Sequence, residues 1–125
     1  MATVTLTSDK FAETVTAPGI TLVDFWAEWC GPCRQFGPIY ENASEAHPDV
    51  VFGKVDTEAE QRLAGEAGIT SIPTLMAFRD GVLVFAQPGA LPAPALEQVI
   101  EAVKALDMDE VHKAIAAQEQ SAPAE

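Results

Sequence analysis

Two cysteines lie three positions apart in the run Cys30-Gly31-Pro32-Cys33, between an apolar stretch and a helical pattern. At the start of a helix this spacing puts both side chains on one face, close to the geometry of a disulfide. Cys30 precedes the first helical turn, where unpaired N–H groups and the helix dipole favour an anion and lower the pKa of a thiol. Cys33 lies inside the helix, where we expect it to be shielded. The pair therefore predicts thiol–disulfide exchange, in which Cys30 attacks a target disulfide and Cys33 resolves the mixed disulfide.

Metal binding is the main alternative use of two closely spaced cysteines. Zinc sites combine two such pairs or add a paired histidine motif, whereas this chain has one pair and two separate histidines, His47 and His112. His47-Pro48 is typical of a helix end, so we assign it no metal. We predict no bound metal and no cofactor beyond the Cys30–Cys33 disulfide. A cysteine ligand set shared across a dimer interface stays open as a minority alternative.

The elements that position the pair alternate between strand and helix. Residues 20–27 form a nearly continuous apolar run, which is typical of a strand buried on both faces. Asp80-Gly81 supplies the positive φ angles of a type I′ turn and predicts a hairpin. Strands are expected over residues 3–6, 20–27, 50–56, 74–79 and 82–86, and helices over about 7–16, 33–46, 58–67 and 92–106. This order predicts an α/β fold with a central mixed sheet and helices on both faces.

Composition excludes several classes of function. The chain has 125 residues, 48% hydrophobic and 21% charged, as expected for one ordinary globular domain. Nineteen acidic against seven basic residues give a charge of −12, so nucleic acid and membrane surfaces are not expected as partners. The N-terminus shows no signal-peptide pattern, and no apolar stretch approaches the ~20 residues of a spanning helix. We therefore expect a cytoplasmic protein.

The C-terminal residues differ in character from the rest. We predict one domain over residues 1–106 and an acidic, Ala-rich extension over residues 107–125, helical at first and then disordered. Met108, Val111 and Ile115 form one narrow apolar stripe at helical spacing. A frayed extension without function is the preferred interpretation of this segment.

The segment Val23-Asp-Phe-Trp-Ala-Glu-Trp-Cys-Gly-Pro-Cys33, together with Ile72-Pro73-Thr74 and Gly89-Ala90, resembles the thioredoxin family. The resemblance covers Val4 to Leu106 and implies the thioredoxin fold, a mixed sheet of about five strands flanked by about four helices. The activity that it implies is reduction of protein disulfides by an electron carrier of cell redox homeostasis. An NADPH-dependent thioredoxin reductase would restore the dithiol, and disulfide-containing client proteins would be the other partners.

The resemblance also implies a proton-transfer role for Asp24. This residue is the one carboxylate within Leu-Val-Asp-Phe-Trp, and burial raises a carboxyl pKa towards neutrality. A buried acid behind the helix start can take the proton of Cys33, through water, as that thiol becomes a nucleophile. Lys54 is expected nearby, where it modulates Asp24. A structural role for Asp24 is the alternative.

A substrate-binding surface is implied around Cys30. The resemblance places a cis peptide bond at Ile72–Pro73, opposite the pair, so that a substrate strand can pair with the backbone of Ile72. We expect a flat apolar patch formed by Trp29, Gly31, Pro32, Ile72, Gly89 and Ala90, and we assign Pro73 to substrate binding with them. Trp26 is assigned to packing.

Three features depart from the family pattern. Gly37 beside Pro38 is expected to loosen the helix at the proline kink. Pro88, just before Gly89, is expected to shorten the last strand and stiffen the substrate loop. The extension beyond Leu106 is longer than the fold requires.

Two other functions use the same fold. A disulfide oxidase or isomerase would run the chemistry in the opposite direction, but such oxidases carry histidine between the cysteines, where this chain has Gly31-Pro32. A redox-independent binding subunit would keep its role after Cys30→Ser, whereas a reductase would not. We expect a monomer, because the apparent exposed apolar patch surrounds the cysteine pair.

Overall fold

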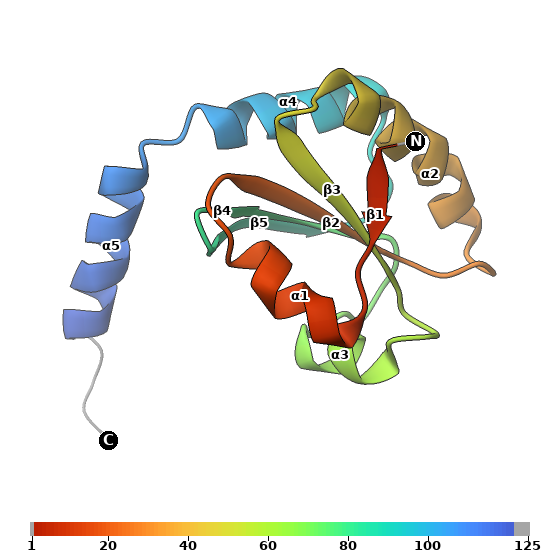
Figure 1. The fold of residues 1–125 in the computed structure, drawn as a ribbon, viewed down its shortest axis with the longest axis horizontal. Coiled ribbons are helices and arrows are strands. Elements are labelled where there is room, and N and C mark those ends of the chain that lie inside the picture. The colour runs from red at the N-terminus through yellow and green to blue at the C-terminus, as the bar shows by residue number, and fades with distance from the viewer. Residues whose placement is uncertain (1, 122–125) are drawn as a thin grey trace.

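A five-stranded mixed sheet carries the cysteine pair just beyond the end of its central strand (Figure 1). The computed structural model describes residues 2–121. The tail predicted from Ser121 onward lies outside them except for Ser121 itself, which belongs to a helix. In chain order the elements are β1 (Thr3–Thr5), α1 (Ser8–Val15), β2 (Ile20–Trp26), α2 (Gly31–Ala46), β3 (Val50–Asp56), α3 (Gln61–Glu66), β4 (Thr74–Arg79), β5 (Val82–Pro88), α4 (Ala93–Lys104) and α5 (Met108–Ser121).

The sheet has the order β1-β3-β2-β4-β5, which confirms the predicted mixed topology. β3 runs parallel to both β1 and β2, whereas β4 runs antiparallel to β2 and to β5. β2 is covered on both faces, with all of its five inner residues buried, as its apolar run predicts. The turn between β4 and β5 has positive φ at Asp80 (51°) and Gly81 (82°), as the type I′ prediction requires.

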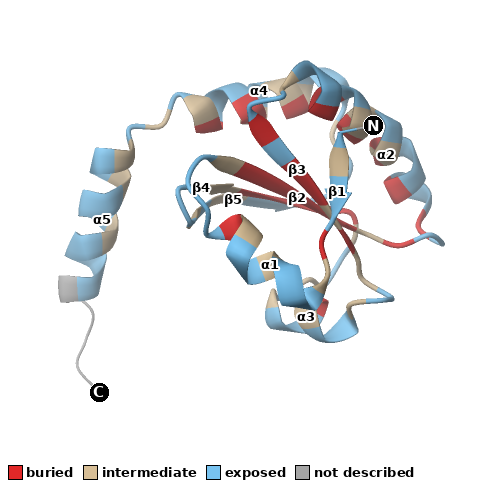
Figure 2. Cartoon of the chain, in the orientation of Figure 1, coloured by how far each residue is buried: buried red, intermediate tan, exposed pale blue. Residues whose placement is uncertain are grey.

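Helices cover the sheet on both faces, and a large hydrophobic core cluster lies on each face (Figures 1 and 2). Side chains of α2 and α4 pack with Leu22 on one face, and side chains of α1 and α3 pack with Val23 and Phe25 on the other. Successive side chains of a strand point to opposite faces. Asp24 therefore shares the face of Leu22 and points to the side of the sheet covered by α2.

Among the element boundaries that differ from the prediction, three have local reasons. α2 begins two residues early, at Gly31, because Cys30 itself is the N-cap. α3 begins late, at Gln61, since the carboxylate of Asp56 accepts the backbone N–H groups of Glu58 and Ala59 and forms a turn there. The expectation that Pro88 shortens the last strand is wrong, because β5 extends through Pro88. β5 lies at the sheet edge, where a proline without an N–H is tolerated.

The predicted extension is helical over α5, which projects away from the sheet (Figure 1). Met108, Val111 and Ile115 are half-buried, and the residues between them are exposed. Arg79 Nη1 donates to the carbonyl oxygens of Val103, Lys104 and Leu106 and so fixes the end of α4 before α5 begins. None of the helices in residues 2–121 has both the length and the apolar character needed to cross a membrane.

Candidate active site

Cys30 and Cys33 form a disulfide at the start of α2, with their Cα atoms 5.2 Å apart. Cys30 is the N-cap, in an extended conformation (φ −87°, ψ 113°), and Cys33 lies in the first turn. The backbone N–H of Cys33 donates to Cys30 Sγ at 3.2 Å. In the reduced protein the same N–H and the helix dipole would face a Cys30 thiolate, which favours the charged form.

Both cysteines are buried in the disulfide form, Cys30 at 4% and Cys33 at 5% exposure. Cys33 is shielded as predicted, but Cys30 is shielded to the same degree. Burial therefore does not distinguish the attacking thiol from the resolving one. What distinguishes them is position, because Cys30 caps the helix and its sulfur accepts the N–H of Cys33.

Asp24 is buried in the middle of β2, with 1% of its surface exposed. Burial raises the pKa of this carboxyl from 3.8 to about 7, and the positive charge of Lys54 partly opposes the increase. Among residues 2–121, no group forms a hydrogen bond with Asp24 Oδ1. The predicted shift towards neutrality is confirmed, with loss of hydration as its first cause.

Lys54 lies beside Asp24, because the two residues are partners in the parallel register of β2 and β3. Its ammonium group sits 4.9 Å above the ring of Trp26, a cation–π contact that the packing role assigned to Trp26 did not anticipate. Trp26, Lys54, Gly37 and Cys33 line a hollow of about 190 Å³ together with Ala27, Glu28 and Arg34. The hollow reaches Cys33 from the same side of the sheet to which Asp24 points.

Trp29 is the most exposed of the large apolar side chains, at 66%. Its indole Nε1 donates to Glu58 Oε1 at 2.7 Å. Sequence reasoning missed Glu58, because it lies in the turn after β3 and nothing in its neighbourhood marks it. Trp29 and Ile72 border a groove of about 340 Å³ whose lining includes Thr57, Thr70 and Ser71. These hydroxyl groups make this part of the surface less apolar than expected.

The loop before β4 meets the cysteine pair through Ile72. The carbonyl oxygen of Ile72 is 3.6 Å from Cys30 Sγ, a contact without a hydrogen bond because a disulfide sulfur carries no proton. The Ile72–Pro73 peptide bond is cis, as predicted. Gly89, at φ +103°, donates its N–H to the carbonyl oxygen of Pro73 at 2.7 Å. Cys30, Ile72, Pro73 and Gly89 are thereby brought together.

The other predicted surface residues flank this group. Gly31 and Pro32 are exposed in the first turn of α2, and Ala90 is exposed just after β5. Gly31 and Pro32 lie between the two cysteines in the sequence, and Ala90 directly follows Gly89.

Comparisons with known proteins agree on one family. A family model described as Thioredoxin matches residues 2–102. A Streptomyces coelicolor protein named "Putative thioredoxin 2" is 62% identical over 121 residues, 97% of this chain and 90% of that protein. A Bacillus subtilis thioredoxin is 38% identical over 101 residues, 80% of this chain and 96% of that protein. The solved structure of a Malassezia sympodialis thioredoxin matches with a TM-score of 0.75 and 32% identity, covering 82% of this chain and 91% of its own.

The C-terminal extension is part of the Streptomyces coelicolor match. Because that alignment covers 97% of this chain, it runs through most of residues 107–125. The Bacillus subtilis match is shorter, at 101 residues. The extension is thus a feature that this chain has in common with one relative, in addition to the fold that it has in common with all of them.

Proposed function

The chain belongs to the thioredoxin family, and we propose that it acts as a general reductant of protein disulfides, kept reduced by an NADPH-dependent thioredoxin reductase in the cytoplasm. It is a dithiol–disulfide oxidoreductase whose redox group is the Cys30–Cys33 pair. The observation that carries the direction of attack is the N-cap position of Cys30, whose sulfur accepts the N–H of Cys33. That position stabilises a thiolate on Cys30 rather than on Cys33.

The reaction proceeds in two exchanges. The Cys30 thiolate attacks one sulfur of a client disulfide, so that a mixed disulfide forms and the other client sulfur leaves as a thiol. Cys33 then attacks Cys30 Sγ, which closes the Cys30–Cys33 disulfide and releases the second client sulfur. The client gains two electrons and two protons, and the dithiol loses them.

Asp24 is the base that we assign to the second exchange. Cys33 must lose its proton before it attacks, and a group with a pKa of about 7 accepts a proton efficiently near neutral pH. The hollow beside Cys33 and Lys54 is large enough for water to relay that proton towards the carboxylate. Once Asp24 has lost its proton, the positive charge of Lys54 stabilises the carboxylate. This charge lowers the pKa of Asp24, which burial raises.

Clients are proposed to bind around Cys30 on the surface formed by Trp29, Gly31, Pro32, Ile72, Gly89 and Ala90. Pro73, predicted as part of this surface, is buried instead and supports it from beneath through its cis bond to Ile72. The contact of the Ile72 carbonyl with Cys30 Sγ supports this binding surface, since an extended client segment paired with that backbone would present its sulfur at the attacking atom. Main-chain pairing depends little on client sequence. It therefore suits a general reductant.

The reduction potential of the pair tests the proposed direction. The protein is equilibrated with defined ratios of reduced and oxidised glutathione, and the fraction of closed disulfide is measured by thiol alkylation and mass spectrometry. Thioredoxins as a class lie near about −270 mV, whereas strongly oxidising relatives lie near about −120 mV. We expect a value near the lower figure. A value near the upper figure would show an oxidase and overturn both the proposed direction and the proposed compartment.

A further inference from the structure

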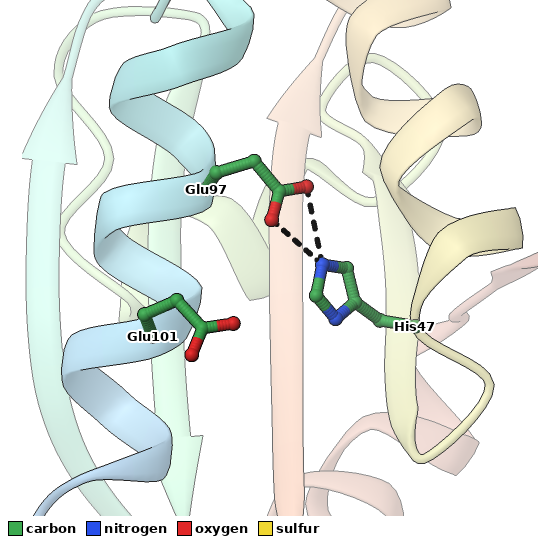
Figure 3. Close-up of side chains that lie close together, drawn as sticks. All are labelled: His47, Glu97 and Glu101. Carbon is green, nitrogen blue, oxygen red and sulfur yellow. Dashed lines mark hydrogen bonds and ion pairs between the residues drawn. The ribbon is translucent and has the colours of Figure 1, made fainter.

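His47, Glu97 and Glu101 bring one imidazole and two carboxylates together where the end of α2 faces α4 (Figure 3). One ligand atom from each side chain lies within 4.8 Å of the other two. Against the expectation from the sequence that His47 binds no metal, we propose that these three side chains bind a divalent transition-metal ion of the Zn²⁺ class. Imidazole and carboxylate ligands suit Zn²⁺, which takes a fourth ligand from water when the protein supplies three.

The site is held by secondary structure. His47 is the C-cap of α2, its backbone N–H bonded to the carbonyl oxygen of Ala43, and its side chain is only 11% exposed. Glu97 and Glu101 are one turn apart on α4, so both carboxylates reach the same side of that helix. Figure 3 shows them directed from α4 towards the imidazole. The three ligands thus come from two helices that pack on the same face of the sheet.

The distances already approach those of a metal site. His47 Nε2 lies 2.8 Å and 3.1 Å from the two oxygens of Glu97. Zn–N and Zn–O bonds of about 2.1 Å place neighbouring ligands of a tetrahedral ion about 3.4 Å apart. The His47–Glu97 pair therefore needs to open by only a fraction of an ångström. Glu101 is exposed and can change rotamer to close the third position.

Lys104 determines which proton the metal replaces. Its ammonium lies 3.0 Å from His47 Nδ1, and a lysine ammonium only donates, so Nδ1 is the acceptor and the imidazole proton sits on Nε2. When a metal takes Nε2, that proton moves to Nδ1 by exchange with water. Lys104 then loses its acceptor, but Asp49 Oδ2 already lies 3.2 Å from the same ammonium. The metal-bound state thus leaves Lys104 paired.

The site is remote from the redox chemistry. The cysteine pair is at the first turn of α2 and His47 follows its last turn, and the 16 residues of the helix span about 24 Å. A metal bound here would join α2 to α4 without covering Cys30. Because it would bind the folded chain, it would raise the unfolding temperature.

Calorimetric titration with ZnCl₂ tests the proposal. The protein is kept in its disulfide form, so that the thiols cannot bind zinc, and it carries His112→Gln to remove the exposed histidine of α5. We expect one ion per chain and an increase in unfolding temperature. Glu101→Gln should weaken binding at least about tenfold, and His47→Gln should abolish it. Glu110→Gln on α5 is the matched control, with no change expected.

Lys104→Met gives a test of opposite sign. It removes a positive charge and the donor that holds Nδ1, so we expect zinc to bind several-fold more tightly. Absence of saturable binding would overturn the proposal. Equal weakening by Glu101→Gln and Glu110→Gln would also overturn it, because it would show attraction to the acidic surface as a whole. Circular dichroism checks that each variant is folded, and the reductase activity is not a readout, so failure here leaves the proposed function intact.

Discussion

The strand that leads into α2 and the residue that ends α2 carry ionisable groups in opposite states of hydrogen bonding. In β2, on the sheet face that α2 covers, Asp24 is buried at 1% exposure, and its Oδ1 has no partner within the described part of the chain. At the end of α2, both nitrogens of His47 are paired, one with Lys104 and one with Glu97. The first arrangement raises the free energy of the charged carboxylate, and the second stabilises a fixed tautomer. Asp24 is thus poised to take a proton, whereas the polar atoms of the His47 ring are satisfied.

The largest effects on activity are expected from substitutions of the cysteines at the start of α2. Cys30→Ser should abolish reduction of a disulfide-bonded protein supplied with dithiothreitol, because it removes the attacking sulfur. Cys33→Ser should still attack but cannot resolve, so a mixed disulfide with the client should accumulate and be visible by mass spectrometry. If Cys33→Ser instead released its client at the wild-type rate, the roles of the two cysteines would be reversed.

Asp24→Asn should stabilise the protein, with an effect that grows with pH. The pKa of Asp24 is raised from 3.8 to about 7 by burial. The folded protein binds the proton of the Asp24 carboxyl more tightly than the unfolded chain does. The stability that comes from this proton is therefore fully present below pH 4 and is lost as pH rises through 7. The difference between the two pKa values corresponds to about 4 kcal/mol in the free energy of unfolding. Urea unfolding of the disulfide form should give Asp24→Asn an advantage of about 2–4 kcal/mol at pH 8 and almost none at pH 4.

The same variant separates the catalytic role of Asp24 from a structural one. If Asp24 accepts the proton of Cys33, Asp24→Asn should slow the resolving step near neutral pH and remove the inflection near pH 7 from its rate profile. Stopped-flow mixing with a preformed mixed disulfide measures this step. An unchanged profile would leave Asp24 with a structural role alone.

Glu97→Ala, at the His47 end of α2, should lower the free energy of unfolding, whereas Asp24→Asn should raise it. It removes the acceptor of His47 Nε2–H, whose side chain is only 11% exposed, so the imidazole loses a partner that water only partly replaces. We expect a loss of about 0.5–1.5 kcal/mol in urea unfolding with chelator present. Glu66→Ala, in an exposed ion pair on α3, is the control and should cost less. Stabilisation by Glu97→Ala would contradict the contrast between Asp24 and His47.

Sequence reasoning predicted the cysteine end of α2 far better than the His47 end. Cys30, Cys33 and Asp24 lie within one short run, and an apolar strand followed by a helix start already fixes their relations. His47 lies 50 residues or more from Glu97 and Lys104 in the sequence and meets them only because α2 and α4 pack on one sheet face. Glu58 reaches Trp29 across 29 positions for a similar reason. Pro88 was misjudged because the sequence does not show that its strand lies at the sheet edge.

Gly37→Ala is expected to have the smallest effect on stability and gives a test of the proton path. A Cβ at Gly37 would meet no atom within 4 Å apart from its chain neighbours and its own helix backbone. Alanine favours a helix. The next residue, Pro38, disfavours helical geometry for any preceding residue with a Cβ. We expect a change below about 1 kcal/mol. Gly65→Ala in α3 is the matched control, since a Cβ there is equally free. Because Gly37 lines the hollow beside Cys33 and Lys54, only Gly37→Ala narrows the space for a water relay. It should slow the resolving step while Gly65→Ala leaves it unchanged, and equal rates in both variants would exclude this hollow as the route from Cys33 to Asp24.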